Sequence, residues 1–469
     1  MAKKLNILVY LSDQQRHDSM GCYGQKLNTS PVADALAREG VLFENAYTCQ
    51  PVCGPARACL QTGTYPTING CHHNAIGLRA DETTIAKELD KIGYDTAYIG
   101  KWHLSSDFAN GIIMVGKPIP PERMGGYKYY VSSEALETTS HGYDGYMFNH
   151  NGNRCDFVGY RTDCVTNYAI QYLHNRQADK PFFLFVSHIE PHQQNDHGCF
   201  EGPDGSKEKF KDYDVPPDLV NGKFEGDWKE NYADYLGQCR ALDDNLGKLI
   251  DTLKETGEYE NTVIIYSSDH GCHFRTQDGE YKRNCFDSCL HIPLIIAGGP
   301  FKGGLRCNRL VSNIQLPTTI LSLAQAPIPE KMVYEPLQMA LDPDCPFGDH
   351  VFYQITETEL ARGIRTAKWK YCVGAPHKQP VMSMEKEYMM GSYHDMMRRS
   401  KPDSDSYIEK YLFDLEADPY EKENLVDDDR YMEERKMLSE TLIKSMVRAG
   451  EAAPAIYPAG TPLPKEYDF

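Results

Sequence analysis

The chain has 469 residues, of which 41% are hydrophobic and 25% are charged, and its 49 basic and 67 acidic residues give a formal net charge of −18. Because a single hydrophobic core stops growing near ~250–300 residues, this length predicts one large domain and one smaller one. The acidic balance and the absence of a long Lys or Arg run argue against nucleic acid as a partner, and no segment reaches the ~18 consecutive apolar residues of a membrane span.

The N-terminal residues predict a first strand and not an export signal. Two lysines precede an apolar run at 6–11, which is short for the apolar part of a signal peptide and is followed by charged residues. The 15 cysteines are an odd number without regular spacing, which favours reduced thiols over a disulfide framework. These observations predict a cytoplasmic protein that does not associate with membranes.

Further apolar runs and helical patterns alternate along the chain. Runs typical of buried strands occur at 96–100, 181–188, 262–269 and 292–298. Between them, Pro31 and Gly40 have the positions of a first helical residue and a helix end, and apolar residues repeat at helical spacing over 228–256. Alternating strands and helices predict an α/β fold with a mostly parallel central sheet sandwiched by helices.

Two long segments and the C-terminal part differ from this pattern. The Gly- and Tyr-rich segment 104–160 and the segment 193–227 are expected to be insertions over the rim of the sheet. After about residue 345, alternating polarity predicts antiparallel strands, and a charged helix follows them. We therefore expect an α/β domain at 1–345 and a small α+β subdomain with an antiparallel sheet at 346–469.

Polar side chains follow four of the predicted strands, at the point where each strand ends. They are Asp13 and Gln14, Lys101 and His103, His188 and His192, and Asp269 and His270. Ligands of open α/β sheets bind beyond the carboxyl ends of the strands, so we expect these side chains to converge. Oxygen donors such as Asp13, Gln14 and Asp269 suit a hard divalent cation, Ca²⁺ or Mg²⁺. Each residue alone is equally compatible with a turn, a helix cap or a core histidine, and only their convergence indicates a site.

The segment CQPVCGPARACLQTG, from Cys49 to Gly63, permits three interpretations. A structural zinc site would use Cys49 and Cys53, whose spacing fits, but Cys59 has no closely spaced partner. A cysteine nucleophile would place Cys53 at the start of a helix whose dipole lowers the pKa of its thiol, although a thiolate is a poor match for a hard cation. In the third interpretation Cys53 is the precursor of another reactive group.

The residues CGPARACLQTG, which begin at Cys53, resemble the signature C-x-P-S/A-R-x-x-x-L-x-T-G of the sulfatase family. Further stretches resemble motifs of that family in the same order: NILVYLSDQ, GYDTAYIGKWHL, FFLFVSHIEPH, IIYSSDHG with Lys282 and HIPLII, and LFDLEADPYEKENL. The chain thus resembles the formylglycine-dependent type I sulfatases of the alkaline-phosphatase-like superfamily. The resemblance implies that fold, with 1–345 as the catalytic domain. Ala56 stands where serine is commonest in the signature.

In that family the signature cysteine is converted after translation to formylglycine, an aldehyde. The resemblance implies that residue 53, as the aldehyde hydrate, attacks the sulfur of a sulfate ester, which makes the protein a sulfuric ester hydrolase. It also implies a Ca²⁺ ion, with Mg²⁺ as the alternative, bound by Asp13, Gln14, Cys53, Asp269 and His270. A formylglycine-generating maturation enzyme is the implied protein partner.

The resemblance further implies six catalytic residues: Cys53, Arg57, Lys101, His103, His192 and Lys282. Arg57, one helical turn beyond Cys53, would hold the hydrate, and Lys101 and Lys282 would neutralise the sulfate oxygens. His103 would assist the hydrate or its collapse. His192 would protonate the leaving alcohol or bind its oxygen.

Contacts with the substrate are expected from three further residues. Asn74 would touch the sulfate, and His273 and Arg275 would contact the organic part. The Tyr-rich stretch at 125–134 either stacks on a sugar or covers the sheet. The resemblance favours a carbohydrate sulfatase, and the predicted cytoplasmic location favours a mono- or disaccharide as its substrate. Two alternatives stay open: a phosphodiester or phosphonate monoester hydrolase of the same superfamily, and a non-catalytic binding protein on this scaffold.

Overall fold

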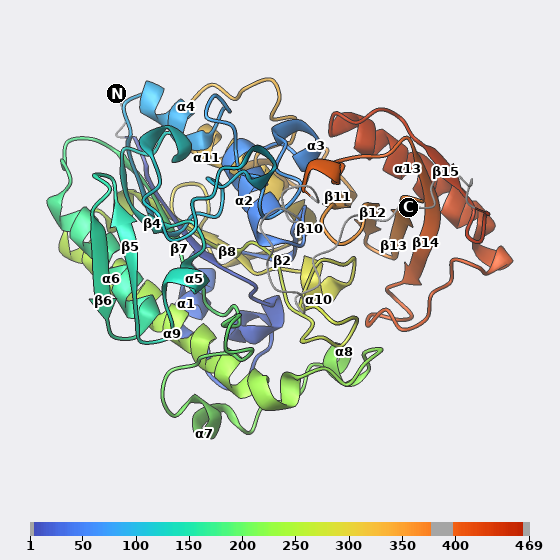
Figure 1. Cartoon of the computed structure of the whole chain (residues 1–469), viewed down its shortest axis with the longest axis horizontal. Helices are drawn as coiled ribbons and strands as arrows, with labels where there is room; N and C mark the ends of the chain where they lie inside the picture. The colour runs from blue at the N-terminus through green and yellow to red at the C-terminus, as the bar shows by residue number, and fades with distance from the viewer. Residues whose placement is uncertain (1–3, 377–396, 463–469) are drawn as a thin grey trace.

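The computed structural model describes residues 4–376 and 397–462, which form two β-sheets and the helices around them (Figure 1). The large sheet has ten strands in the order β10-β2-β9-β8-β1-β7-β3-β4-β5-β6. In that order their bounds are Leu305–Ser312, Val41–Tyr47, Leu294–Ala297, Thr262–Ser268, Asn6–Ser12, Phe182–Ser187, Asp95–Lys101, Tyr129–Ser133, Asp144–Asn149 and Arg154–Val158. The predicted mostly parallel sheet is confirmed.

The centre of the large sheet is parallel and fully buried. β1 pairs in parallel with β7 and β8, and β3 pairs in parallel with β7 and β4. Every residue of β1, β7 and β8 is buried, as expected for strands covered on both faces. The predicted strands at 6–11, 96–100, 181–188 and 262–269 therefore correspond to β1, β3, β7 and β8. The predicted strand at 292–298 is β9, and it runs antiparallel to both of its neighbours.

Helices cover both faces of this sheet. The larger ones are α1 (Pro31–Glu39), α2 (Cys53–Thr62), α4 (Ile85–Lys91), α6 (Arg161–Asn175), α9 (Trp228–Glu255) and α11 (Leu316–Leu323). The short ones are α3 (Pro66–Asn69), α5 (Leu136–Thr139), α7 (Ser206–Phe210), α8 (Pro217–Val220) and α10 (Asp287–Leu290). Alternate residues of β1 point to opposite faces: Ile7 and Val9 pack with α2, α4 and α11, whereas Leu8 and Tyr10 pack with α1, α6 and α9. The predicted sandwich of helices is thereby confirmed.

The segment 104–160 corrects one expectation. It was predicted to be an insertion over the rim, but it contributes β4, β5 and β6, which extend one edge of the large sheet. Tyr127 and Tyr130 of its Tyr-rich stretch are buried in the core, so they cover the sheet. The segment 193–227 contributes no described strand, and its residues Phe200 and Phe210 pack against α9. At the opposite edge, β2 and β10 form a parallel pair that the sequence patterns did not indicate.

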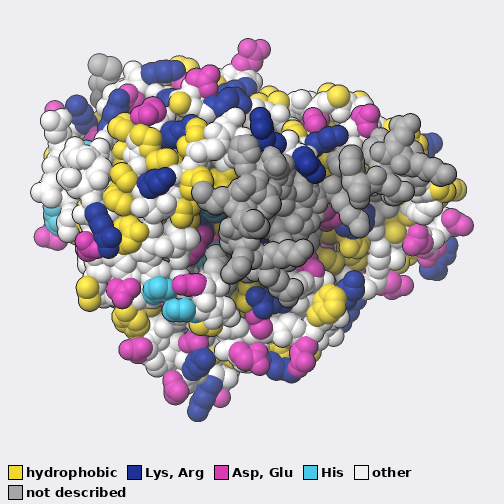
Figure 2. Space-filling model, in the orientation of Figure 1, with side chains coloured by type: hydrophobic (Ala, Val, Ile, Leu, Met, Phe, Trp, Pro, Cys, Tyr) yellow, Lys and Arg dark blue, Asp and Glu magenta, His cyan; other side chains and the backbone are white. Residues whose placement is uncertain are grey.

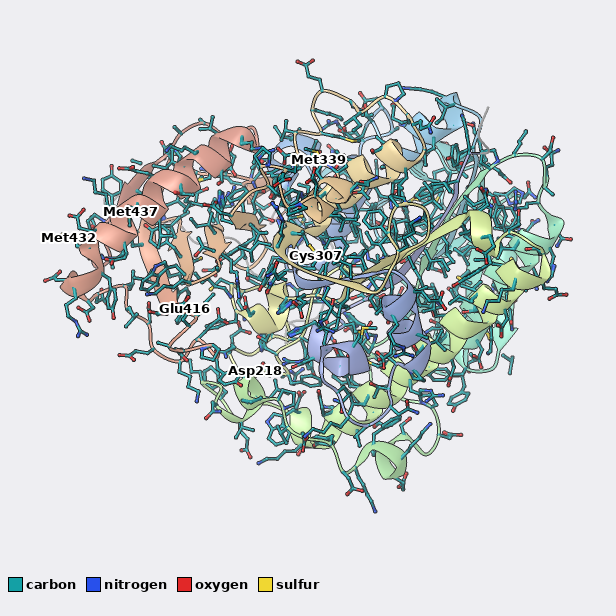
Figure 3. All side chains as sticks on the ribbon, turned by 180° about the vertical axis from the view of Figure 1, so that it is seen from behind. Asp218, Cys307, Met339, Glu416, Met432 and Met437 are labelled. Carbon is teal, nitrogen blue, oxygen red and sulfur yellow. The ribbon has the colours of Figure 1, made fainter. Side chains whose placement is uncertain are left out.

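The second sheet belongs to the C-terminal part. Its strands are β11 (His350–Ile355), β12 (Ala361–Thr366), β13 (Trp369–Gly374), β14 (Ser406–Asp414) and β15 (Ala455–Tyr457). The first four pair antiparallel, and β15 pairs in parallel with β14. Helix α13 (Met432–Arg448) packs Leu438 and Leu442 on this sheet, and Met432 and Met437 lie on its outer side (Figure 3). The predicted antiparallel sheet with a helix is confirmed.

The second sheet also packs on the large domain. Tyr353 and Cys372 share an apolar cluster with Tyr47 and Leu310. This packing crosses the predicted boundary between 1–345 and 346–469, and the division of the chain into two domains there stays a prediction. Among the described residues, no helix is both long enough and apolar enough to cross a membrane.

Candidate active site

The carboxyl ends of four adjacent strands meet at one edge of the large sheet. Asp13 follows β1, Lys101 is the last residue of β3, Ser187 ends β7, and Asp269 follows β8. These strands are neighbours in the order β8-β1-β7-β3, so their polar ends lie side by side. The convergence expected from the sequence is therefore present in the structure.

Helix α2 brings Cys53 to this edge. Cys53 is the first residue of the helix, and all ten residues of α2 are buried. No side chain of Val52, the residue before the helix, caps it; instead Asn74 Oδ1 accepts a hydrogen bond from the Gly54 N–H at 2.9 Å. The positive end of the helix dipole thus points at the strand ends, where it favours a negative group.

Charged groups surround the Cys53 sulfur closely. Its Sγ atom lies 2.9 Å from Lys282 Nζ, 3.2 Å from His270 Nε2 and 3.4 Å from Asp13 Oδ1. Burial alone would raise the pKa of the Cys53 thiol, but Lys282, Lys101 and the neighbouring histidines together outweigh burial and hold this pKa well below its usual range. The environment therefore stabilises negative charge on an atom at position 53.

Arg57 lies one helical turn beyond Cys53 and connects the strand ends. Its Nη2 donates to Asp13 Oδ2 at 3.0 Å, and its Nε lies 3.2 Å from Asp269 Oδ2. Its Nη1 donates to the Lys101 carbonyl oxygen at 3.0 Å. Since these groups are buried, the guanidinium fixes the positions of two carboxylates relative to the helix.

Lys101 is completely buried between two carboxylates. Its Nζ lies 2.8 Å from Asp13 Oδ2 and 3.2 Å from Glu137 Oε1. Burial would raise the pKa of Glu137, but Lys101 and His103 outweigh it and lower the pKa to about 2. Glu137 was not predicted, because it belongs to the short helix α5 inside the segment interpreted as an insertion. Against the effect of burial, Asp13 and Glu137 together raise the pKa of Lys101 and keep it charged in the interior.

The donor set fits a hard divalent cation. The ligand atoms of Asp13, Cys53, Asp269 and His270 lie within 4.8 Å of one another, and all four residues are buried. Gln14 is adjacent to this group: its backbone N–H donates to Asp269 Oδ1 at 3.1 Å, and its side-chain Nε2 donates to Gln193 Oε1 at 2.6 Å. Its buried Oε1 has no hydrogen-bond partner among the described residues. Burial and the charge of Asp13 raise the pKa of Asp269. A cation would satisfy the oxygen of Gln14 and offset the repulsion between the two carboxylates.

His103, His192 and Asn74 also lie beside residue 53. His103 and His192 are each within hydrogen-bonding reach of Cys53. Burial and Lys282 lower the pKa of His192, whose Nδ1 lies 2.6 Å from the Gln193 carbonyl oxygen. The structure therefore brings together every predicted catalytic and metal-binding residue, although the role of each stays a prediction.

His273 and Arg275 have other partners. His273 is fully buried, and its Nε2 lies 3.5 Å from Asp278 Oδ1. Arg275 stacks on the ring of Tyr281 at 4.6 Å and lies 3.8 Å from Asp227 Oδ2, with 40% of its side chain exposed. Their predicted contacts with a substrate stay predictions. Arg275 has the exposure that such a contact requires.

One residue beside the site comes from the C-terminal part and was not predicted from the sequence. Glu357, after β11, accepts hydrogen bonds from Arg283 Nε and from the Asn74 N–H, each at 2.9 Å. Arg283 follows Lys282 in the chain, and Asn74 accepts the hydrogen bond from the Gly54 N–H at the start of α2. No local pattern could have indicated Glu357, since 283 residues separate it from Asn74.

The family model described as Sulfatase matches residues 5–326 of the chain. The chain belongs to the sulfatase family. Its reaction class is sulfuric ester hydrolysis. An N-acetylglucosamine-6-O-sulfatase of Bacteroides thetaiotaomicron is 25% identical over an alignment that covers 94% of this sulfatase and 86% of the relative. An ulvan-active sulfatase of Formosa agariphila is 30% identical, with 78% of this sulfatase and 72% of the relative covered.

Solved structures share the fold of this sulfatase. One protein, in complex with its substrate D-glucosamine-2-N,6-O-disulfate, superimposes with a TM-score of 0.73 at 23% identity over 96% of this sulfatase and 99% of that chain. A phosphonate monoester hydrolase of Agrobacterium radiobacter has a TM-score of 0.70 at 20% identity, with 95% and 96% covered. The predicted alkaline-phosphatase-like fold is confirmed.

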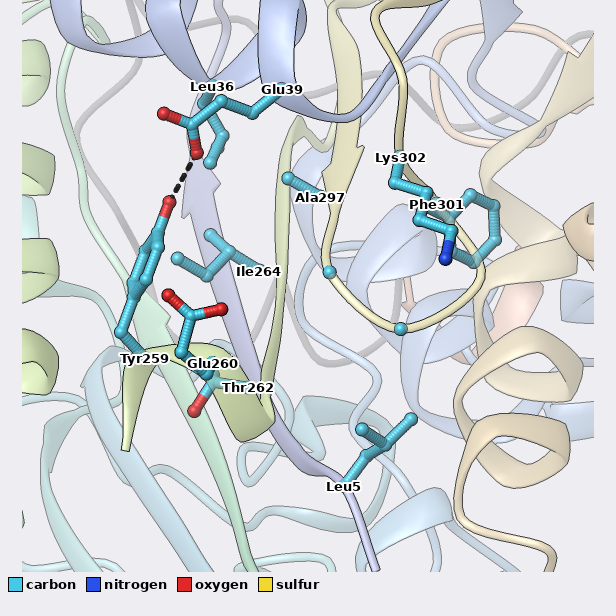
Figure 4. A pocket seen from close by; sticks show the side chains of 12 residues that line it. Leu5, Leu36, Glu39, Tyr259, Glu260, Thr262, Ile264, Ala297, Phe301 and Lys302 are labelled. Carbon is cyan, nitrogen blue, oxygen red and sulfur yellow. Dashed lines mark hydrogen bonds between the residues drawn. The ribbon is translucent and has the colours of Figure 1, made fainter. Parts of the chain in front are cut away.

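This sulfatase also has a cavity at the opposite end of its strands (Figure 4). The cavity measures about 370 Å³ and is lined by residues at the amino ends of β1 and β8, including Leu5 and Thr262. Tyr259 donates a hydrogen bond to Glu39 Oε2 at 2.6 Å beside it. None of the predicted site residues lines this cavity, so it is separate from the candidate active site.

Proposed function

We propose that this sulfatase hydrolyses the sulfate ester of a small sugar, a mono- or disaccharide, and that Cys53 acts after conversion to formylglycine. The placement of Cys53 carries the proposal: it is buried at the start of α2, with Lys282, His270 and Asp13 within 3.4 Å of its sulfur. The relatives named for N-acetylglucosamine-6-O-sulfate and ulvan support a sugar substrate. A similar fold binds D-glucosamine-2-N,6-O-disulfate.

Water adds to the aldehyde of formylglycine at residue 53 and gives a hydrate with two hydroxyls on one carbon: one attacks sulfur, and the other lets sulfate leave as the aldehyde re-forms. A divalent cation, Ca²⁺ with Mg²⁺ as the alternative, would be held by Asp13, Gln14, Asp269, His270 and residue 53. When bound, it supplies positive charge that favours an ionised hydroxyl and attracts sulfate.

The surrounding side chains have separate tasks. Arg57 holds Asp13 and Asp269 in position and orients residue 53. Lys101 and Lys282 neutralise the negative charge of the sulfate oxygens, which is worth most in a buried site. These three cationic side chains already lie at the site before the substrate arrives, so the reaction requires little reorganisation.

Two histidines transfer the protons in the proposed reaction. His192 donates a proton to the alcohol oxygen as the sulfur–oxygen ester bond breaks, and the anionic sulfate beside it favours the protonated ring. His103 accepts the proton of the second hydroxyl of residue 53 as sulfate leaves. Asn74 stays at the start of α2, where it accepts the Gly54 N–H; its contact with sulfate is part of the proposal.

The alternative is a phosphodiester or phosphonate monoester hydrolase, whose fold this sulfatase shares. The test uses protein produced together with a formylglycine-generating enzyme, the proposed maturation partner. Conversion of Cys53 lowers the mass of its peptide by about 18 units. We expect sulfate release from 6-O-sulfated N-acetylglucosamine and only weak turnover of p-nitrophenyl phosphonate and phosphodiesters. Converted protein that prefers the phosphorus esters, or an equally active Cys53→Ala variant, would overturn the proposal.

The cytoplasm is the proposed compartment, and the 15 free cysteines support it because unpaired thiols suit a reducing environment. Fractionation of cells that produce the protein tests this point: recovery with an extracytoplasmic marker would contradict it.

A further inference from the structure

A second group of metal-ligating side chains lies at the surface. His141, Asp196 and His197 each offer one ligand atom, and these atoms lie within 4.8 Å of one another. His141 follows α5, whereas Asp196 and His197 belong to the segment after β7. Figure 2 shows histidine side chains beside acidic ones on this face of the molecule. The group is separate from Asp13 and the ligands proposed with it.

The three side chains already contact one another. His141 Nε2 lies 2.9 Å from Asp196 Oδ2. The rings of His141 and His197 are nearly parallel, with centroids 4.5 Å apart and an interplanar angle of 6°. An ion must lie in the plane of each imidazole, so binding requires the rings to tilt. Because their side chains are 44% and 49% exposed, this motion meets little packing resistance.

Two of the three ligands, His197 and Asp196, are also held by a second polar group. His197 Nδ1 is hydrogen-bonded to Glu201 Oε1, which leaves Nε2 to bind an ion. The other oxygen of Glu201 accepts the Gly142 N–H at 2.7 Å, next to His141. Asp196 Oδ1 accepts from Gln194 Nε2 at 2.9 Å. A carboxylate behind a ligating histidine is the usual second layer of a zinc site, because it fixes the tautomer and the direction of the ring.

We propose that His141, Asp196 and His197 form a binding site for Zn²⁺ or a similar first-row divalent ion. Two imidazoles and one carboxylate suit Zn²⁺ better than Ca²⁺, which prefers oxygen ligands alone. Tetrahedral coordination at about 2.1 Å requires ligand atoms about 3.4 Å apart. The atoms of His141 and Asp196, now 2.9 Å apart, must therefore separate slightly, and atoms that are as much as 4.8 Å apart must approach. The remaining positions on the ion are open to water.

The bound ion links two segments of the candidate active site. Asp196 and His197 follow His192 by only four and five residues. Gln194, which lies between His192 and Asp196 in the chain, donates a hydrogen bond to the Glu137 carbonyl oxygen at 2.7 Å. The side chain of Glu137 contacts Lys101. An ion at this site therefore ties the segment that carries His192 to the end of α5. Its effect is to hold these segments together, and it takes no part in the reaction.

Calorimetric titration of the full chain with Zn²⁺, in saturating Ca²⁺, tests the site. We expect the unchanged protein to bind one more equivalent of Zn²⁺ than the double variant His141→Ala/His197→Ala. Glu201→Gln should lower the affinity of that equivalent by about 10- to 100-fold, the usual effect of removing a second-layer partner. His174→Ala, which removes an exposed histidine of α6, should bind like the unchanged protein. All variants keep every cysteine and the proposed metal site at Asp13. Any Zn²⁺ that binds to those groups therefore contributes equally to each titration.

Equal Zn²⁺ stoichiometry in the double variant, or unchanged affinity in Glu201→Gln, would overturn the proposal. Thermal unfolding provides a second measurement. The Tm of the unchanged protein should rise as the Zn²⁺ concentration is increased, whereas the Tm of the double variant should stay constant. The Tm values without Zn²⁺ establish that each variant is folded. These measurements do not use turnover, so their outcome does not depend on the proposed reaction.

Discussion

Glu357 and Arg283 form an ion pair between the C-terminal part and the candidate active site, with Arg283 Nε donating to Glu357 Oε1 at 2.9 Å. Arg283 is next to Lys282, whose Nζ lies 2.9 Å from Cys53 Sγ. Glu357 also accepts the N–H of Asn74, the residue that caps the start of α2. One carboxylate of the C-terminal part thus contacts two chain segments that lie beside Cys53.

Glu357→Gln should destabilise the protein by about 1–3 kcal/mol at pH 7, because it removes the less exposed of the two carboxylates that pair with the half-buried Arg283. Glu280→Gln removes the more exposed partner of Arg283 and should cost less than about 1 kcal/mol. Denaturant unfolding at pH 7 measures both. Equal losses of unfolding free energy in the two variants would contradict the larger contribution expected from Glu357.

The same pair predicts a dependence of stability on pH. Burial would raise the pKa of Glu357, but His73 and Arg283 outweigh it and lower the pKa to about 2. A depressed carboxyl pKa stabilises the fold above the unfolded value near ~4.5, and this stabilisation is lost as the pH falls toward the folded value. The difference in unfolding free energy between the unchanged protein and Glu357→Gln should therefore shrink between pH 6 and pH 3.5. A constant difference would show that the charge of Glu357 is not responsible.

Lys101→Met should lower kcat by about 10²–10³-fold, because it removes a buried positive charge near the sulfate position while keeping a similar chain length. Glu137→Gln leaves Lys101 in contact with Asp13 and should cause a smaller loss. Steady-state kinetics on converted protein gives both values. If Lys101→Met kept its kcat and raised only KM, Lys101 would serve binding alone.

Gln14→Ala should weaken Ca²⁺ binding by at least about tenfold, since it removes an oxygen ligand from a set of few. Gln14→Glu keeps an oxygen at that position and should retain binding. Titration of chelator-treated protein with Ca²⁺, followed by calorimetry, distinguishes the two variants. Removal of the ion by a chelator should also abolish turnover, and activity that survives chelation would exclude the proposed cation.

His192→Ala should lower kcat by about 10²–10⁴-fold on a sugar sulfate, whose alcohol leaves only after protonation. The loss should be much smaller on p-nitrophenyl sulfate, since nitrophenolate leaves without a proton. The ratio of the two losses is the decisive quantity. Equal losses would assign His192 to binding or positioning and not to proton transfer.

Leu442→Ala in α13 should destabilise the protein by about 2–5 kcal/mol, because its side chain is fully buried against the second sheet. Met437→Ala in the same helix is the matched control: Met437 is 61% exposed and its removal should change stability by less than about 0.5 kcal/mol. Thermal or denaturant unfolding measures both, and a large effect at Met437 would show that another surface covers it.

The sequence by itself determined the parts of this protein that depend on neighbouring residues. The apolar runs of β1, β3, β7 and β8 are local features, and each is followed by the polar residues that the structure places at one edge. The stretch from Cys53 to Gly63 is continuous, so its resemblance to the sulfatase signature could be read without a structure. The family and the central parallel sheet followed from these features.

The tertiary structure alone decided which distant segments meet. The edge strands β2, β10 and β4–β6 take their places through pairing with other strands, and β9 runs antiparallel although its apolar pattern resembles that of its neighbours. Glu137 beside Lys101, Glu357 beside Arg283, and the group of His141, Asp196 and His197 are likewise contacts between separate segments. A side chain in a loop has no periodicity to reveal its partner, because burial and charge pairing act through space and not along the chain.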